Sequence, residues 1–348
     1  MQRTPQEWMN PALPLPPAAL SARELDELMR AVEDRDEPLV SDQHVVSQVV
    51  LREFSERDKN GGASLAAYNL EFKSRKVLGT RGCGKIKDWM PVASSSIEKL
   101  WQKTETHLAK ALRSLKDGSI FGDDVSASIL RDAVALHYVR SVHMRSLAQN
   151  AASEAYIGQF PGIIQKYQRR LALEFFRRHG RLPSSTEEYQ QTVECIVRDR
   201  QQEMVESLFR VKAEEAFRRV QRIFSQITFE IIAAPKSKEF LIADAPVCGT
   251  SPHGRRHETG PHNGLGLYAA REWTMPLTPK YAIRLPSQEA VYSKANNKKI
   301  DKINAAQVRN SYRHVYFRPP GNALVEFVLQ SADEWRKPPA VGPLRLFD

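Results

Sequence analysis

The sequence predicts an α+β fold, in which a helical middle is joined to a small mixed sheet built from N- and C-terminal strands. Apolar stripes with spacings of three and four residues fill the region from residue 95 to about residue 229. Short runs rich in β-branched and aromatic residues lie on both sides of that region. A chain of 348 residues, 41% of them hydrophobic, is long enough to bury a sizeable core. Helices grouped between strand-rich ends are typical of the α+β class.

Composition divides the chain into an arm, a body and a tail. Residues 1–40 are proline-rich and hold four basic and eight acidic side chains, and a capping pattern at Ser21 predicts a short helix to about Val32. We predict a single α+β domain over residues 41–335 and a tail over residues 336–348. Because the whole chain carries a net charge of +10, the excess of positive charge lies beyond the arm. This asymmetry suggests a polyanion such as nucleic acid as a partner of the domain, or an acidic arm that lies on a basic body. A well-solvated basic surface is the alternative.

The first elements of the domain are a short helix or turn and a strand. The spacing of Val46, Val49 and Val50 suits a helix over residues 45–54, although the β-branched content suits a strand. A turn signal at residues 59–62 leads into an alternating segment, which predicts a strand over residues 63–72.

Four helices are expected next. The first begins at Ser95 or Ser96 and ends at Asp117, and the second covers residues 126–148. The third begins at residues 161–162 and ends before Gly180, and a long fourth helix runs from Thr186 to about residue 229. Beyond it, one more helix is predicted over residues 300–313, together with four short strands at residues 239–243, 281–285, 315–317 and 324–328.

Three separated polar residues are the main candidates for a catalytic site: His44, Arg140 and Asp244. Arg140 falls on the apolar stripe of its helix, where a guanidinium needs a carboxylate, and Asp244 is the partner that we expect. His44 would complete the set as an acid–base group, with Asp244 as an orienting or metal-binding carboxylate. The competing interpretation is a buried ion pair that fixes the packing of the two halves of the chain.

An alternative catalytic pair is Arg309 and His314, whose spacing resembles that in helical metal-independent RNases of bacterial conflict systems. There the histidine moves a proton from a ribose 2′-hydroxyl and the arginine stabilises the charge on the phosphorane. Five further basic residues are candidates for binding a nucleic-acid backbone, with a solvated surface as the alternative: Arg177, Arg178, Arg181, Arg255 and Arg256.

Several classes of protein are disfavoured because their motifs are missing. The sequence has no P-loop, dinucleotide fingerprint, H-E-x-x-H motif or nucleophile elbow. It has no membrane-spanning stretch and no secretory pattern, and its three cysteines are scattered, so we expect a cytoplasmic protein with no membrane partner. One cysteine and three histidines between residues 248 and 262 lack the paired spacing of zinc ligands. No metal ligands are therefore assigned, and a divalent metal stays open as a cofactor.

Several short motifs follow one another in an order that is typical of one family. His44 and Val46, with Leu51 and Phe54, resemble an N-terminal His-x-Val-Pro…Leu-Arg-x-Phe signature, in which Ser47 replaces the proline. Further motifs lie in the expected order at residues 97–105, 136–141, 244–247, 276–279, 304–305 and 315–316. Over residues 43–330 the chain resembles a bacterial family known as a domain of unknown function (forty-two thirty-eight). The resemblance implies a fold and a polar centre, and it supplies no established reaction.

The basic domain and the separated polar residues favour a bacterial protein that binds or cleaves nucleic acid in phage defence or stress. The alternative is a non-enzymatic interaction or structural protein, whose buried polar centre is architectural and whose arm docks a protein partner. Neither interpretation identifies a substrate.

Overall fold

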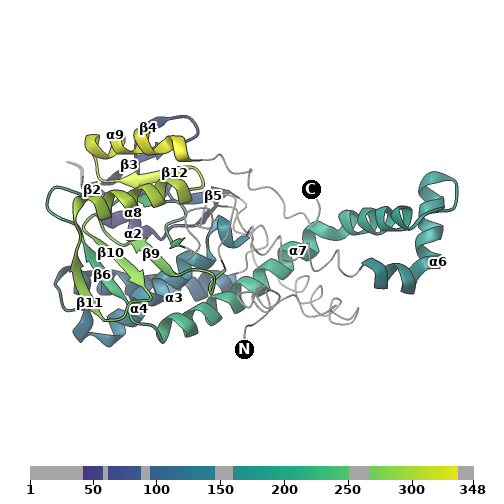
Figure 1. Ribbon diagram of the computed structural model, residues 1–348, viewed down its shortest axis with the longest axis horizontal. Helices are drawn as coiled ribbons and strands as arrows, with labels where there is room; N and C mark the ends of the chain where they lie inside the picture. Colours follow the sequence, from purple (N-terminus) through teal and green to yellow (C-terminus); the bar gives the residue numbers. More distant parts are fainter. Residues whose placement is uncertain (1–41, 58–61, 88–94, 146–159, 251–265, 336–348) are drawn as a thin grey trace, which may run out of the picture. The chain divides into compact units, whose positions relative to one another are not determined.

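The computed structural model describes residues 42–57, 62–87, 95–145, 160–250 and 266–335. The chain divides into two compact units. The helical unit comprises residues 1–38, 147–212 and 342–348, and the body comprises residues 39–146 and 213–341. The predicted α+β class is confirmed, because strands from both ends of the sequence pair in the body beside helices from its middle (Figure 1). The arm and the tail lie outside the described residues, and the predicted domain boundaries stay predictions.

The described part of the helical unit is built from α6 (Phe160–His179) and the first part of α7 (Thr186–Ser225). Gly180 ends α6 in a left-handed conformation, with a φ of 70°. In the connection that follows, Arg181 forms an ion pair with Glu188 in the first turn of α7. Both predicted helices are therefore present, close to their predicted starting residues.

An antiparallel sheet in the body joins the two ends of the sequence. Its strands are β2 (Glu56–Arg57), β3 (Ala63–Asn69), β4 (Ser74–Gly79), β7 (Ile242–Ala243) and β12 (His314–Phe317). Strand β3 pairs with β4 and β12, and β12 pairs with β7 on its other side. Because Val315 lies opposite both Tyr68 and Ala243, this register brings the residues next to these three positions together.

A second, mixed sheet has the strand order β11, β6, β10, β9, β8. Its strands are β6 (Glu230–Ala233), β8 (Cys248–Thr250), β9 (Glu272–Pro276), β10 (Tyr281–Leu285) and β11 (Val291–Lys294). Only β11 runs parallel to its neighbour. A short third sheet pairs β1 (Asp42–His44) with β5 (Lys85–Lys87).

Helices of the body that lie where helices were predicted are α2 (Gln48–Glu53), α3 (Ser95–Lys116), α4 (Asp124–Val139) and α8 (Asn297–Asn310). A further helix is α9 (Asn322–Ser331). Helix α4 ends at Val139, where Arg140 takes up the C-cap position and the hydroxyl of Ser141 donates to the Tyr138 carbonyl. The chain is helical again over residues 142–145, so the helix predicted over residues 126–148 is interrupted at these two positions.

The prediction of a strand at residues 324–328 is wrong, because this segment lies inside α9. The apolar run has helical as well as strand spacing, and its side chains pack as a helix face on the cluster that contains Val315 and Phe317. Gly321 precedes the helix with a φ of 54°, and a side chain at that position would collide with the Phe317 ring. The apolar pattern of residues 324–328 alone did not distinguish a strand from a helix.

Candidate functional site

The three main candidate residues all lie in the body, but the structure divides them between two clusters. The first, the His44–Arg140 cluster, consists of His44, Trp101, Glu105, His137 and Arg140. The second, the Asp244 cluster, consists of Asn69, Asp244, His314 and Tyr316. The paired strands β3, β12 and β7 bring the second cluster together, whereas α3, α4 and the end of β1 supply the first.

Arg140 is held by a different carboxylate from the one that the sequence suggested. Its side chain is 3% exposed, and its Nη1 lies 3.0 Å from Oε1 of Glu105, which is 26% exposed. The guanidinium carbon lies 5.2 Å from the centre of the Trp101 ring, which adds a cation–π contact. The expected pairing of Arg140 with Asp244 is thus wrong, because α3 packs against α4 and supplies the counter-charge from Glu105.

His44 lies at the end of β1, close enough to Arg140 to respond to its charge. Burial lowers the pKa of His44, and the cations of Arg140 and Lys85 lower it further, while Glu105 acts in the opposite direction. The imidazole is therefore neutral at pH 7. Within the described residues, His44 Nε2 and Arg140 Nε are both buried without a hydrogen-bond partner. Two buried polar atoms thus have hydrogen-bonding capacity that the described residues do not use.

His137 lies on α4, three residues before Arg140, and each of its ring nitrogens has a hydrogen-bond partner. Its Nδ1 lies 2.7 Å from the Ala133 carbonyl, and its Nε2 accepts the backbone N–H of Ser47 at 3.0 Å. The carbonyl requires a donor and the N–H requires an acceptor, so the proton of the neutral ring is on Nδ1. Burial lowers the pKa of His137 to about 4. His137 thus fixes the start of α2, three residues beyond His44, and has no free nitrogen for chemistry.

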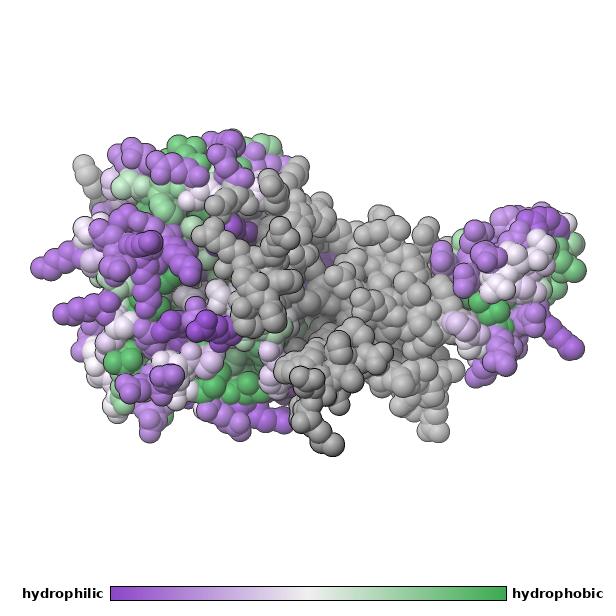
Figure 2. Space-filling model, in the orientation of Figure 1, coloured by the Kyte–Doolittle hydropathy of each residue, from purple (hydrophilic) through white to green (hydrophobic). Residues whose placement is uncertain are grey.

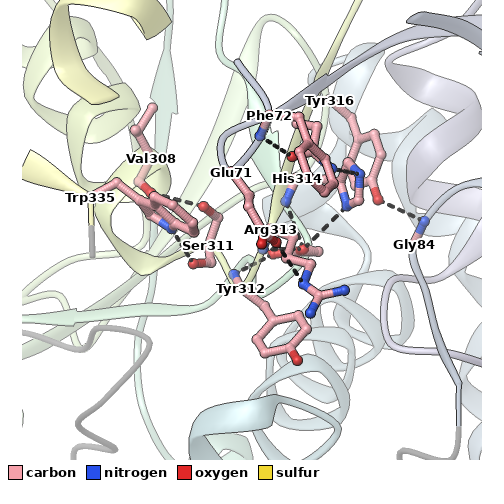
Figure 3. Close-up of polar contacts among 12 residues, drawn as sticks. Glu71, Phe72, Gly84, Val308, Ser311, Tyr312, Arg313, His314, Tyr316 and Trp335 are labelled. Atoms are coloured by element: carbon pink, nitrogen blue, oxygen red, sulfur yellow. Dashed lines mark hydrogen bonds and ion pairs between the residues drawn. The ribbon is translucent and has the colours of Figure 1, made fainter. Parts of the chain in front are cut away.

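Asp244 accepts three backbone hydrogen bonds from one turn. Figure 3 labels the residues of this turn, Tyr312, Arg313 and His314. Its carboxylate receives the N–H groups of Tyr312, Arg313 and His314 at 2.6, 2.8 and 2.8 Å, where the chain passes from α8 to β12. Burial raises the pKa of Asp244, whereas these donors and the His314 ring favour its ionised form. The arrangement makes Asp244 the residue that shapes this turn.

His314 is oriented by contacts on both of its nitrogens. The amide oxygen of Asn69 accepts the N–H of Phe72 at 2.9 Å, which turns the Asn69 amide nitrogen toward His314 Nε2 at 3.0 Å. His314 Nε2 is therefore an acceptor, and the protonated Nδ1 faces Asp244 Oδ2 at 3.9 Å. The ring also stacks on Tyr316, whose hydroxyl accepts the N–H of Gly84 at 3.0 Å. Since Asn69 occupies Nε2, this geometry disfavours His314 as a proton-transfer group, and the Arg309–His314 pair stays untested.

The five arginines proposed to bind a nucleic-acid backbone are not members of either cluster. Arg177 and Arg178, on α6 in the helical unit, both form ion pairs with Glu174. Arg181 is engaged by Glu188. Arg255 and Arg256 lie outside the described residues. Hydrophilic side chains, shown in purple, project from the visible faces of the body and of α6 in Figure 2.

No set of metal ligands is apparent in the described ranges. Among these residues, no group of three or more histidine, cysteine, aspartate or glutamate side chains is placed to hold a metal ion. Cys248 is buried, and its sulfur accepts the side-chain amide of Gln307 at 3.0 Å, while the three nearby histidines lie outside the described residues. No helix in the same ranges has the length and apolar character to cross a membrane.

The comparisons with known proteins decide the family. The family described as "Protein of unknown function (DUF4238)" matches residues 42–321. The chain belongs to this family. The matched region of this DUF4238 member begins at β1, two residues before His44, and includes every residue of both clusters. No curated protein and no solved structure matched the chain.

One site residue, Glu105, was not singled out as functional from the sequence of this DUF4238 member. Glu105 lies four residues after Trp101 on α3, and this spacing places the two side chains on one face of the helix. The spacing could have indicated Glu105, but it could not show that this face meets Arg140.

Proposed function

We propose that the body binds nucleic acid and cleaves it at the His44–Arg140 cluster, in phage defence or stress. The observation that carries this proposal is a neutral imidazole with an unpartnered Nε2 beside a buried guanidinium with an unpartnered Nε, within the described residues. A phosphodiester needs a base for the attacking hydroxyl and a cation for the charge that develops on the phosphate oxygens. His44 and Arg140 supply these two groups.

In this mechanism each residue has a separate task. His44 Nε2 takes the proton of the attacking hydroxyl as the new P–O bond forms, and the resulting imidazolium returns that proton to the leaving oxygen as the old P–O bond breaks. Arg140 binds a non-bridging phosphate oxygen through its Nε. Glu105 holds the other side of the guanidinium, which fixes its orientation. Asp244 is a positioning residue, because it shapes the turn that leads into β12 and does not face the reacting atoms.

The overall charge supports attraction of a polyanion. The chain carries a net charge of +10, and neutralising phosphates with lysine and arginine makes binding weaken as salt rises. We assign Arg177, Arg178, Arg181, Arg255 and Arg256 a role in contacting the backbone. The first three of these must share their charge with Glu174 or Glu188.

The test is incubation of the pure protein with labelled RNA and DNA, with and without a divalent metal. We expect salt-sensitive binding, and cleavage that His44→Asn abolishes while leaving the melting temperature close to that of the parent. The matched control is His107→Asn on the exposed face of α3, which should cleave normally. Absence of both cleavage and salt-sensitive binding would overturn the proposal.

The second candidate function is a non-enzymatic interaction protein with an architectural polar centre. The observation that favours it is the full engagement of Asp244, His137 and His314 with backbone and side-chain partners. On this alternative the N-terminal arm, outside the described residues, docks a protein partner in the cytoplasm. His44→Ala then lowers the melting temperature and removes no specific activity.

A further inference from the structure

The antiparallel sheet of the body has one edge at β7 and another at β4, and side chains of α8 cover the edge at β7. At the β7 end, α8 replaces a neighbouring strand with side-chain amides. Asn304 Oδ1 accepts the N–H of Leu241 at 3.1 Å, and Gln307 Oε1 accepts the N–H of Ala243 at 2.9 Å. Asn304 Nδ2 also donates to the Glu239 carbonyl at 2.9 Å. The backbone groups on this outer side are thus covered, as edge strands in stable sheets usually are.

The β4 end is open in the part of the chain that the structure describes. There, β4 pairs with β3 alone, from Ser74 opposite Asn69 to Gly79 opposite Ser64. The four consecutive residues from Lys76 to Gly79 are exposed. Because successive side chains point to opposite faces of a strand, both faces of β4 are exposed there as well as its edge. This segment has room for a further strand.

The open strand and its turn carry apolar side chains that a covered surface would bury. Phe72 is 73% exposed, Val77 is 53% exposed and Leu78 is 38% exposed. A strand added beside β4 would give Val77 a cross-strand neighbour on one face of the sheet and Leu78 a cross-strand neighbour on the other face. The surface therefore offers main-chain hydrogen bonds for affinity and alternating apolar contacts for specificity, which is how added peptide strands are recognised.

Charge decides what kind of strand fits. Residues 72–81 contain four basic side chains and no acidic one: Lys73, Arg75, Lys76 and Arg81. A second copy of β4 paired antiparallel with the first would bring these like charges together, which destabilises such a pair. An acidic segment would meet them with opposite charge.

We propose that the β4 edge binds an extended, acidic segment of a partner protein as an added strand. The partner's backbone pairs with β4 on the side away from β3. Its carboxylates face Lys73 and Lys76, and its apolar residues cover Val77 and Leu78. Strand β4 contains none of the residues of the His44–Arg140 cluster, and binding at its edge does not depend on nuclease activity.

The proposal is tested with two synthetic peptides, one that alternates glutamate with valine and one that alternates lysine with valine. Binding to the full chain is measured by fluorescence anisotropy, and amide hydrogen exchange reports which strand is covered. We expect the acidic peptide to bind and to slow exchange within residues 74–79, and the basic peptide to do neither. N-methylation of the acidic peptide along its pairing edge should abolish binding, because main-chain donors are lost.

Matched charge variants make the test decisive. The double variant Lys73→Glu with Lys76→Glu changes two exposed residues and should weaken the acidic peptide about tenfold while admitting the basic one. Lys298→Glu with Lys302→Glu, on exposed positions of α8, makes the same change in net charge and should have no effect. Equal loss in both variants would overturn the proposal, as would binding without protection of β4, pairing of β4 with a second copy, or preference of the edge for an oligonucleotide.

Discussion

His137 makes the stability of the body depend on pH within a defined window. The ring is fully buried, donates to the Ala133 carbonyl and accepts the Ser47 N–H. Burial lowers the pKa of His137 from 6.5 to about 4, and the charge of Arg140 acts in the same direction. A second proton would in addition place an N–H donor against the N–H of Ser47.

The sign and size of the effect follow from linkage. Because the folded pKa is lower than the unfolded one, the unfolded chain binds the proton first as the pH falls. Stability from the neutral ring is therefore complete above about pH 6.5 and is lost progressively down to about pH 4. A shift of this size corresponds to about 3 kcal/mol of unfolding free energy in total, of which about 2 kcal/mol is lost between pH 7 and pH 5.

The assay compares urea unfolding of the parent protein and His137→Gln at pH 7 and pH 5. Burial also lowers the pKa values of His44 and His314, so both proteins should lose stability on acidification. The difference between them isolates His137: the parent should lose about 2 kcal/mol more than the variant over this interval. A control variant, His107→Gln, removes an exposed imidazole from α3 and should lose as much as the parent.

The reasoning fails if the parent and His137→Gln lose equal stability between pH 7 and pH 5. It also fails if the nitrogen chemical shifts of the His137 ring place the proton on Nε2 at pH 7. The second measurement is independent of the first, because it reports the tautomer in the folded state without unfolding the protein. A variant that is merely less stable at both pH values would leave the predicted difference intact.

Three further experiments test the packing of the two clusters and of Ser47, which bonds to His137 of the first. Asp244→Ala leaves three backbone donors without their carboxylate, so urea unfolding should show a loss of more than about 4 kcal/mol. Arg140→Met should lower the free energy of unfolding more when Glu105 is present than when Glu105 is already replaced by Gln. A double-mutant cycle should therefore give a coupling energy of about 1 kcal/mol or more. Ser47→Pro should change the free energy of unfolding by less than about 2 kcal/mol. The hydrogen bond from the Ser47 N–H to His137 is lost, but proline restricts the unfolded chain and so offsets part of that loss.

Helix periodicity predicted most of the helical body correctly, because apolar residues at spacings of three and four need only one face to pack. The starts of α3 and α7 were recognised from Ser95 and Thr186. The same reasoning failed at residues 324–328, where a short apolar run fits both a strand and a helix. The outcome there depends on the cluster around Phe317, which the local sequence does not reveal.

The need of Arg140 for a carboxylate could be predicted from the sequence, but the pairings of the candidate residues could not. That Arg140 needs a carboxylate follows from its position on an apolar helix face, and the structure supplies one. Which carboxylate it meets depends on how α3 packs on α4. Asp244 instead accepts the backbone N–H of Tyr312, because β7 pairs with β12 in a register that places Ala243 opposite Val315. Strand register between segments so distant in sequence has no local signal.

Ser47 shows how one position can satisfy two different demands. Ser47 has a φ of −56° and a ψ of 132°, which a proline would adopt without strain. The first demand is this backbone conformation at the start of α2. Serine also supplies the N–H that His137 Nε2 accepts, and a proline could not. Since that N–H makes the protonated ring unfavourable, a chain with proline at this position should hold the histidine with a higher pKa than this chain does, and Ser47→Pro with a ring titration measures the difference.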